Sequence, residues 1–300
     1  MKVVFFNHYH NGDIHVSRGI IRKIMEKVLH QQPDTTFFYS HRNSPELLLD
    51  IPNLIFDPLL INNINQYDNL VKIQDTVYIN TWYAQQHNKY LNQYGITFDS
   101  LYAALDDTCK KLWNFSLIDI STNISDFFPS IDYSRFKIDT AKIWLNNNLK
   151  KKILVENCFA KSYQSINFSI IPTIIELANK HKHKDKIYIL SNNEGNNLPE
   201  NIIYASDVIQ KQNNNLNEIS FLSTHCDIII GRASGPFTFS LTQENLFKRN
   251  IKYLCFSNLM PRQINKFWLS HLLSDKINYT SNIIVNNDYK NILNFIDCNI

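Results

Sequence analysis

The chain contains 300 residues, 44% of them hydrophobic, which is enough for one large or two mid-sized folded domains and excludes a disordered chain. A net charge of +3 with scattered basic residues argues against nucleic acid as the main partner. No window approaches the ~20 apolar residues of a membrane span, and the N-terminal apolar run is too short for a signal peptide. The five cysteines are widely spaced and lack a C-x-x-C pair, which argues against a disulfide framework and a zinc knuckle. We therefore expect a cytoplasmic protein without a transmembrane segment.

The first half of the chain begins with a strand, a helix and a second strand. Residues 2–7 are the first strand, and apolar residues recur at helical spacing over 14–29 before Pro33 ends the helix. Because the connection to the strand at 36–40 is short, the two strands should pair in parallel. The remaining elements predicted before residue 150 are a short helix opened by Ser44-Pro45, strands at 53–56 and 76–82, and helices at 99–113 and 138–149.

Strand and helix begin to alternate afresh after the polar run at residues 146–152. We therefore place a domain boundary between residues 150 and 151. The elements predicted beyond it are strands at 153–156, 187–191, 201–205, 227–230, 253–257 and 283–285, and helices at 169–181, 216–223, 237–247, 263–273 and 289–296. Two successive α/β runs predict two doubly wound, Rossmann-like domains that face a cleft.

The segment at residues 221–242 combines a buried strand, a turn with two glycines and the start of a helix. Its β-branched run at 227–230 is typical of a central strand in a parallel sheet. Gly231 and Gly235 are interpreted as sites of unusual backbone angles, and Pro236 suits the first turn of a helix. Such a junction offers N–H groups to a phosphate at the carboxyl edge of the sheet, although an ordinary strand-to-helix turn has the same pattern.

A polar junction at residues 8–15 lies between the first strand and the first helix. Gly12 permits a tight turn, and Asp13 is either a helix N-cap or a general base that deprotonates an acceptor hydroxyl. His8 and His10 alternate on the strand end, where they are candidates to hydrogen-bond substrate or, alternatively, to bind a metal ion. The other candidate acceptor contacts are His15, Arg18 and Trp82.

A third polar junction, at residues 156–165, follows the first strand of the second domain. Lys161, Ser162 and Gln164 place one cation and neutral donors where a diphosphate would lie, although a polar surface loop has the same composition. A hydrolase built on Cys158 or Cys226 is an open alternative, for which no base is oriented by the sequence pattern.

Two of these motifs resemble the GT-B glycosyltransferases of the ADP-heptose lipopolysaccharide heptosyltransferase kind. In that family a Gly-Asp pair ends the first strand, and its aspartate is the proposed base. A Ser/Thr-Gly-Pro turn after a late strand holds the donor phosphates. Asp13 matches the first motif, and the second is matched by Ser234, Gly235, Pro236 and Thr238.

The sequence departs from the family pattern at two positions. Arg232 stands where the family commonly has a small polar residue, and Lys161 is only a loose match to the family's lysine after the first strand of its second domain. These differences leave the donor sugar and the phosphate arrangement open.

The resemblance implies an acceptor-binding domain at residues 1–150 and a nucleotide-sugar-binding domain at 151–300. It implies an inverting, metal-independent transfer with no cofactor, from a nucleotide-sugar donor to a glycan, lipid-linked or other hydroxyl acceptor. Asp13 and His10 are then the catalytic candidates. The departing diphosphate would be stabilised by Lys161, Ser162, Gln164 and the turn that contains Gly231, Arg232 and Ser234.

Two other functions remain compatible with the sequence. One is a metal-dependent hydrolase that uses the His8 and His10 pair, which lacks further ligands at a convincing spacing. The other is a non-catalytic nucleotide- or glycan-binding protein, because a fold does not imply turnover.

Overall fold

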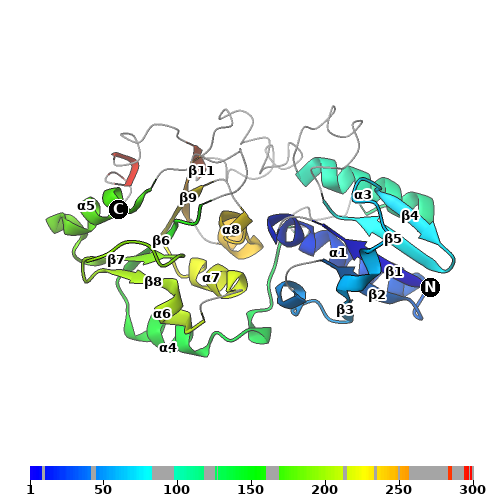
Figure 1. Cartoon of the computed structure of the whole chain (residues 1–300), viewed down its shortest axis with the longest axis horizontal. Coiled ribbons are helices and arrows are strands. Elements are labelled where there is room, and N and C mark those ends of the chain that lie inside the picture. Colours follow the sequence, from blue (N-terminus) through cyan, green and yellow to red (C-terminus); the bar gives the residue numbers. More distant parts are fainter. Residues whose placement is uncertain are drawn as a thin grey trace. The chain divides into compact units, whose positions relative to one another are not determined.

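The computed structural model describes residues 1–8, 11–41, 45–82, 98–117, 126, 128–159, 169–211, 215–232, 235–248, 251–256, 283–285, 294–296 and 298. These residues form two compact units, each built on its own sheet (Figure 1). The first unit contains the described residues up to Asp132, and the second contains those from Tyr133 onward. The division falls before the predicted boundary at 150 and 151, because helix α4 (Asp139–Asn147) packs against α6 (Ala205–Ile209) of the second unit.

The described part of the first unit contains a five-stranded sheet in the order β3-β2-β1-β5-β4. Its strands are β1 (Lys2–Phe6), β2 (Thr36–Ser40), β3 (Leu54–Phe56), β4 (Leu70–Ile73) and β5 (Thr76–Asn80). Strand β1 is central because its apolar residues are buried on both faces. The predicted parallel pairing of β1 with β2 is confirmed, with Val4 opposite Phe38.

Strand β4 was not predicted from the sequence. It pairs antiparallel with β5 through a two-residue turn at Gln74 and Asp75, in which Gln74 has a φ of 51°. Tight hairpins usually place glycine or asparagine in such positions, so this turn carries no recognisable signal. The strand also lies at the edge of the sheet with Ile73 exposed, which removes the usual alternation of apolar and polar residues.

Two long helices accompany the first sheet and pack against each other, and short 3-10 turns connect the strands. The helical elements are α1 (Asn11–Gln31), η1 (Pro45–Leu48), η2 (Pro58–Ile61) and α3 (Phe98–Trp113). Helix α1 is buried over much of its length, and the Arg18 guanidinium ion-pairs with Asp50 just after η1 at 2.6 Å. This buried pair fixes the connection after β2 against the helix.

The described part of the second unit contains a six-stranded sheet in the order β11-β10-β9-β6-β7-β8, and every pairing is parallel. The strands are β6 (Lys151–Glu156), β7 (Lys186–Leu190), β8 (Ile202–Tyr204), β9 (Ile228–Arg232), β10 (Lys252–Phe256) and β11 (Ile283–Val285). The chain adds strands outward from β6 on one side and from β9 on the other. This is the doubly wound arrangement predicted from the alternation of strands and helices.

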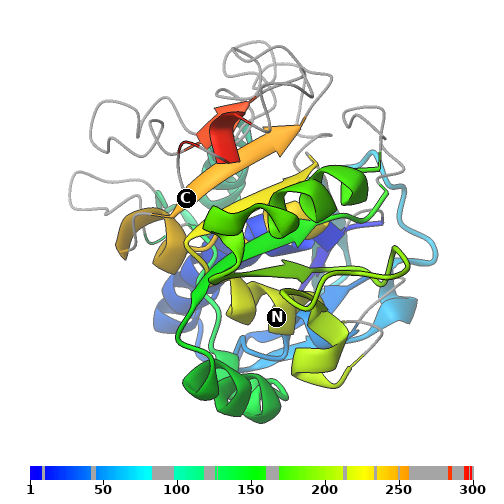
Figure 2. The same cartoon turned by 90° about the vertical axis from the view of Figure 1, so that its left-hand side faces the viewer.

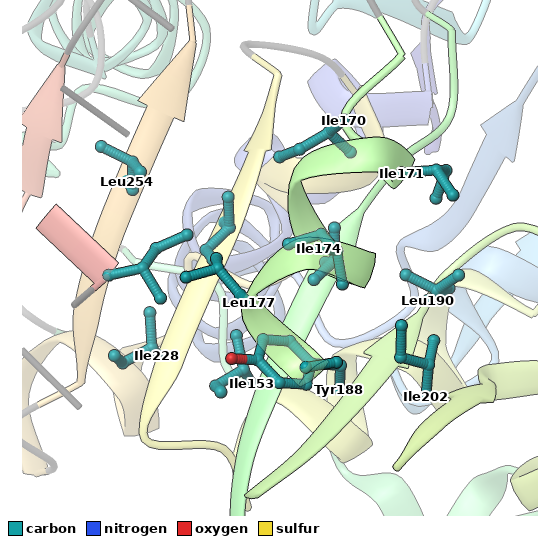
Figure 3. Close-up of a cluster of buried hydrophobic side chains, with 14 of the residues drawn as sticks. Ile153, Ile170, Ile171, Ile174, Leu177, Tyr188, Leu190, Ile202, Ile228 and Leu254 are labelled. Carbon is teal, nitrogen blue, oxygen red and sulfur yellow. The ribbon is translucent and has the colours of Figure 1, made fainter. Parts of the chain in front are cut away.

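One face of this sheet carries the main apolar core. Helix α5 (Ile171–Asn179) lies across β6 and β7 in Figure 2, and its isoleucines and Leu177 pack on alternate residues of the strands in Figure 3. The sheet residues of this core include Ile153, Val155, Ile228, Ile230 and Leu254. Because side chains alternate along a strand, Leu154, Glu156, Ile229 and Gly231 must face the other side.

The predicted helix at 237–247 is wrong in its extent. The structure has a single turn, α8 (Gly235–Thr238), followed by the π-helix η7 (Glu244–Lys248). The carbonyl of Ser240 accepts hydrogen bonds from the Tyr253 hydroxyl and the Asn245 amide, both at 2.8 Å. These side chains take the place of helical N–H donors, so the helix ends there.

The remaining helical elements of the second unit are η5 (Tyr133–Arg135), η6 (His181–His183) and α7 (Leu216–Ser223). The prediction of α7 is confirmed at both ends. The helix predicted at 263–273 lies outside the described residues, and of the helix predicted at 289–296 only residues 294–296 are described and helical.

Candidate functional site

The strand order of the second sheet points to one edge as a binding site. After β6 the chain winds through α5 to β7, whereas after β9 it winds in the opposite direction to β10. In open α/β sheets the crevice at such a switch point, outside the carboxyl ends of the two strands, is where ligands bind. The switch point lies between β6 and β9, so the residues at issue are Glu156, Asn157, Gly231 and Arg232.

Gly231 is required for packing at this edge. It lies opposite Glu156 in the strand register, and a Cβ at Gly231 would lie 2.6 Å from the Glu156 Cβ and 2.8 Å from the Phe237 ring. Neither Gly231 nor Gly235 has the unusual backbone angle that the sequence suggested, because Gly195 is the glycine with positive φ among the described residues. The chain needs a small residue at this position, because Gly231 is packed between Glu156 of β6 and Phe237 of α8.

Glu156 is the last residue of β6 and only 2% exposed. Burial raises the pKa of its carboxyl group to about 7, and the nearby Ser191 hydroxyl opposes this shift. Neither carboxyl oxygen makes a hydrogen bond to the part of the chain that the structure describes. The sequence identified the junction at residues 156–165 but not Glu156 as a functional candidate.

Arg232 ends β9 and is 1% exposed. Its guanidinium donates hydrogen bonds to the carbonyl oxygens of Asn157 at 2.7 Å and Cys158 at 2.9 Å. The half-exposed ring of Phe159 stacks on it, with 4.7 Å between the guanidinium carbon and the ring centroid. Arg232 therefore ties the first turn after β6 to the end of β9 and brings a positive charge to the switch point.

A hydrogen-bond network extends from Asn157 to the end of β7. The Asn157 side chain accepts from the Asn192 backbone N–H at 2.8 Å and donates to the Asn192 carbonyl at 2.9 Å. Its amide also donates to the Glu194 carboxylate at 3.3 Å, and its backbone N–H donates to Ser191 at 3.2 Å. These contacts hold the ends of β6 and β7 in register. No local sequence pattern reveals this network, because it joins residues more than thirty positions apart.

The other donor-site candidates fall into two groups. Gly235, Pro236 and Thr238 form the single turn α8, in which Thr238 is buried and the first two residues are half-buried. Lys161, Ser162, Gln164 and Ser234 lie outside the described residues. Cys158 is an unfavourable nucleophile, because burial and the neighbouring Glu156 raise the pKa of its thiol to about 11.

The first sheet has its own switch point, between β1 and β5, and Asp13 belongs to the helix that leaves β1. Asp13 is the third residue of α1, so it is not the N-cap considered from the sequence. It is 7% exposed, and burial raises the pKa of its carboxyl group to about 8. Burial raises the pKa of Tyr39, and the Asp13 charge adds to this effect, while the hydrogen bond between the Tyr39 hydroxyl and Thr81, at 2.8 Å, opposes it.

The four candidate acceptor contacts are placed differently. His8 follows β1, is half-buried and packs edge-on against Phe6, while Trp82 follows β5 and is also half-buried. Both therefore lie at the carboxyl edge predicted for them. His15 and Arg18 are fully buried within α1, and Arg18 is engaged by Asp50 and by the Leu47 carbonyl. His10 lies outside the described residues.

Two further features of the described residues concern metal binding and membrane-spanning helices. No group of three or more histidine, cysteine, aspartate or glutamate residues is placed to hold a metal ion within the described ranges. None of the helices in those ranges is long and apolar enough to cross a membrane.

The two sheets, each with its switch point, have the GT-B fold of glycosyltransferases. The structure is similar to a glycosyl transferase family 9 protein from Veillonella parvula DSM 2008, with a TM-score of 0.52 and 10% identity over 99% of this chain and 90% of that one. It is also similar to the E. coli heptosyltransferase WaaC, solved with ADP, with a TM-score of 0.50 and 11% identity over 100% of both chains. No protein-family model and no curated protein matches the sequence. The structural likeness confirms the predicted fold.

Proposed function

We propose that this protein is a glycosyltransferase that moves a sugar from a nucleotide-sugar donor to a hydroxyl acceptor. The observation that carries the proposal is a GT-B fold whose second sheet has a buried cation, Arg232, and a buried carboxyl group, Glu156, at its switch point. Phosphate-bearing ligands bind at this place in doubly wound sheets. The similar heptosyltransferase WaaC was solved with ADP and with ADP-2-deoxy-2-fluoro heptose, which supports an adenine nucleotide as the first ligand to test.

In the proposed mechanism the second unit holds the nucleotide. Arg232 stabilises negative charge on the leaving diphosphate as the bond to the sugar breaks, together with Lys161, Ser162 and Gln164 of the loop after β6. Preorganised charge of this kind is usually the largest contribution to the rate of a group transfer. The turn formed by Ser234, Gly235, Pro236 and Thr238 contributes neutral donors.

The first unit binds the acceptor and supplies the general base. Asp13 takes the proton from the acceptor hydroxyl as that oxygen attacks the anomeric carbon, which inverts the configuration of the sugar. A base with a pKa of about 8 suits this step, because a general base works best when its pKa is near the operating pH. His8, His10 and Trp82 contact the acceptor, a glycan, a lipid-linked sugar or another hydroxyl compound. We assign His15 and Arg18 a structural role in helix α1, since both are fully buried.

The first test is ligand binding, measured as a rise in melting temperature. ADP, UDP, GDP, CDP and dTDP are compared with and without EDTA, because a ligand that binds the native state raises its stability by mass action. At least one nucleotide should raise the melting temperature, and the chelator should leave this rise unchanged. Gly235→Val should abolish the nucleotide-induced rise in melting temperature. A cooperative melting transition of this variant without nucleotide shows that it folds. If all five nucleotides leave the wild-type protein unchanged, the proposal fails.

A further inference from the structure

Two runs of lysines that are separate in the sequence meet at one edge of the second sheet. The first run, Lys150 to Lys152, leads into β6, and the second has a lysine at every second position from 180 to 186 and leads into β7. The two strands pair in parallel with Lys151 opposite Lys186, so both runs lie where these strands begin. The lysines of this surface, which we call the basic edge, are Lys150, Lys151, Lys180, Lys182, Lys184 and Lys186.

The two runs are close enough to share a counter-charge. Lys186 ion-pairs with Asp185 at 2.6 Å, and Lys180 pairs with Glu176 at 3.9 Å. The hydrogen bond from Lys186 lowers the pKa of the exposed Asp185 carboxyl group, and the charge of Lys150 adds to this effect. A lysine of the first run therefore acts on a carboxylate of the second.

The basic edge keeps an excess of positive charge. Lys150, Lys151 and Lys184 are exposed, and none of the three forms an ion pair with the described part of the chain. The starts of the neighbouring strands contribute the carboxylates Asp227 and Glu200 and the cation Lys252. Together with Asp185 and Glu176, four carboxylates thus stand against seven lysines along this edge of the sheet.

An apolar side chain stands directly beside these cations. Leu149 precedes Lys150 and is 90% exposed, more than any other large hydrophobic residue that the structure describes as exposed. A single exposed leucine is ordinary on a protein surface, but one next to several lysines matches the boundary of a lipid bilayer. There the ammonium groups bind lipid phosphates while the leucine enters the acyl region. A nucleic acid would use the lysines equally well but offers an aliphatic side chain little on its phosphate backbone.

We propose that the basic edge binds an anionic membrane surface, with its lysines on the lipid phosphates and Leu149 inserted between the headgroups. Clusters of four to eight basic residues are typical of surfaces that recognise anionic lipids. The basic edge lies where the strands begin, whereas the candidate donor site lies at their carboxyl ends, so membrane binding leaves that site of the second unit accessible. The inference goes beyond the proposed function and does not depend on it.

The test is co-sedimentation of the full chain with vesicles of phosphatidylcholine alone or of equal parts phosphatidylcholine and phosphatidylglycerol. The protein should bind only the anionic vesicles, and raising the salt from roughly 0.05 M to roughly 0.5 M should release it, because salt screens exposed charges. Lys150→Gln/Lys151→Gln should weaken binding about twenty-fivefold, since each lysine near such a surface contributes about fivefold. Leu149→Ser should weaken it about tenfold by removing the inserted apolar group. Lys72→Gln/Lys111→Gln is the matched control: it removes the same charge from exposed lysines of the first unit and should bind like wild type.

Three results would overturn the inference. The first is equal binding, or none, to the two kinds of vesicle at low salt, which needs no variant. The second is a loss in the control variant as large as that in Lys150→Gln/Lys151→Gln, because net charge and not the basic edge would then govern binding. The third is tighter binding to a DNA duplex than to anionic vesicles, unaffected by Leu149→Ser, which would assign the basic edge to nucleic acid. All variants change exposed side chains, so their melting temperatures should match that of the wild-type protein.

Discussion

Replacing Asp13 by asparagine should make the protein more stable at alkaline pH and remove its transferase activity. The side chain of Asp13 is 7% exposed, and burial raises the pKa of its carboxyl group from 3.8 to about 8. Asparagine has nearly the same shape but never carries the charge. The substitution therefore isolates the cost of ionising this group inside the folded protein.

The magnitude follows from the linkage between proton binding and folding. A pKa that is higher in the folded than in the unfolded chain means that the folded protein loses stability as pH rises from about 4 to about 8. A shift of roughly four units corresponds to about 5 to 6 kcal/mol, at ~1.4 kcal/mol per unit. Asparagine escapes this loss, so the stability of the variant relative to wild type should grow through this range and level off above it.

Urea unfolding at pH 5, 7 and 9 measures this difference, fitted with separate transitions for the two units. Asp34→Asn is the matched control, because Asp34 is an exposed carboxylate of the same unit, and its effect should not depend on pH. An Asp13→Asn protein that is no more stable than wild type at pH 9 would refute this prediction. That result would mean that the ionised carboxylate is already satisfied in the folded protein.

Activity provides the second half of the same test. A general base contributes ~10²–10⁴ to turnover, and Asp13→Asn should lose that factor while nucleotide binding by the second unit persists. Wild-type turnover should rise with pH up to about 8, as the base loses its proton. If the variant keeps near wild-type turnover, Asp13 is not the base, and His8 and His10 become the candidates.

Three further predictions concern packing, charge and reactivity. Gly231→Ala should destabilise the protein by about 1–3 kcal/mol in thermal or urea unfolding, because its Cβ overlaps two neighbours, and an unchanged stability would contradict the packing role. Asp50→Asn should cost about 3–5 kcal/mol in urea unfolding, because it leaves the buried Arg18 guanidinium without its counter-charge, and a loss below 1 kcal/mol would contradict this. Cys158 should react with iodoacetamide at pH 8 more slowly than the exposed Cys298, measured by mass spectrometry, because its pKa is raised to about 11. Faster labelling of Cys158 would show a thiolate and reopen the cysteine hydrolase alternative.

The amino-acid pattern was sufficient for most of the secondary structure and for the fold. Short β-branched runs such as 228–230 identify buried parallel strands, because both faces of such a strand are apolar. The order of strands and helices then predicts two doubly wound sheets, since parallel strands require crossover connections of one hand. Strand β4 was not predicted because it is a half-exposed edge strand, and the turn that follows it lacks the glycine or asparagine that usually indicates a hairpin.

Only those parts of the candidate site that are contiguous in sequence were predicted. The junctions after β1, β6 and β9 were recognised because polar residues directly follow apolar strands. The sequence also singled out Asp13, but it did not reveal the burial that raises the pKa of this carboxyl group or its electrostatic interaction with Tyr39 of strand β2.

Tertiary structure decided which of these residues share a face and what surrounds them. Glu156 and Gly231 lie opposite each other because β6 and β9, seventy-five residues apart along the chain, are neighbours in the sheet. The sequence alone suggested that Gly231 was needed for its backbone angles, whereas the register shows that it is needed for its size. Strand register, burial and charge pairing arise from contacts between distant segments, and no local pattern of residues encodes them.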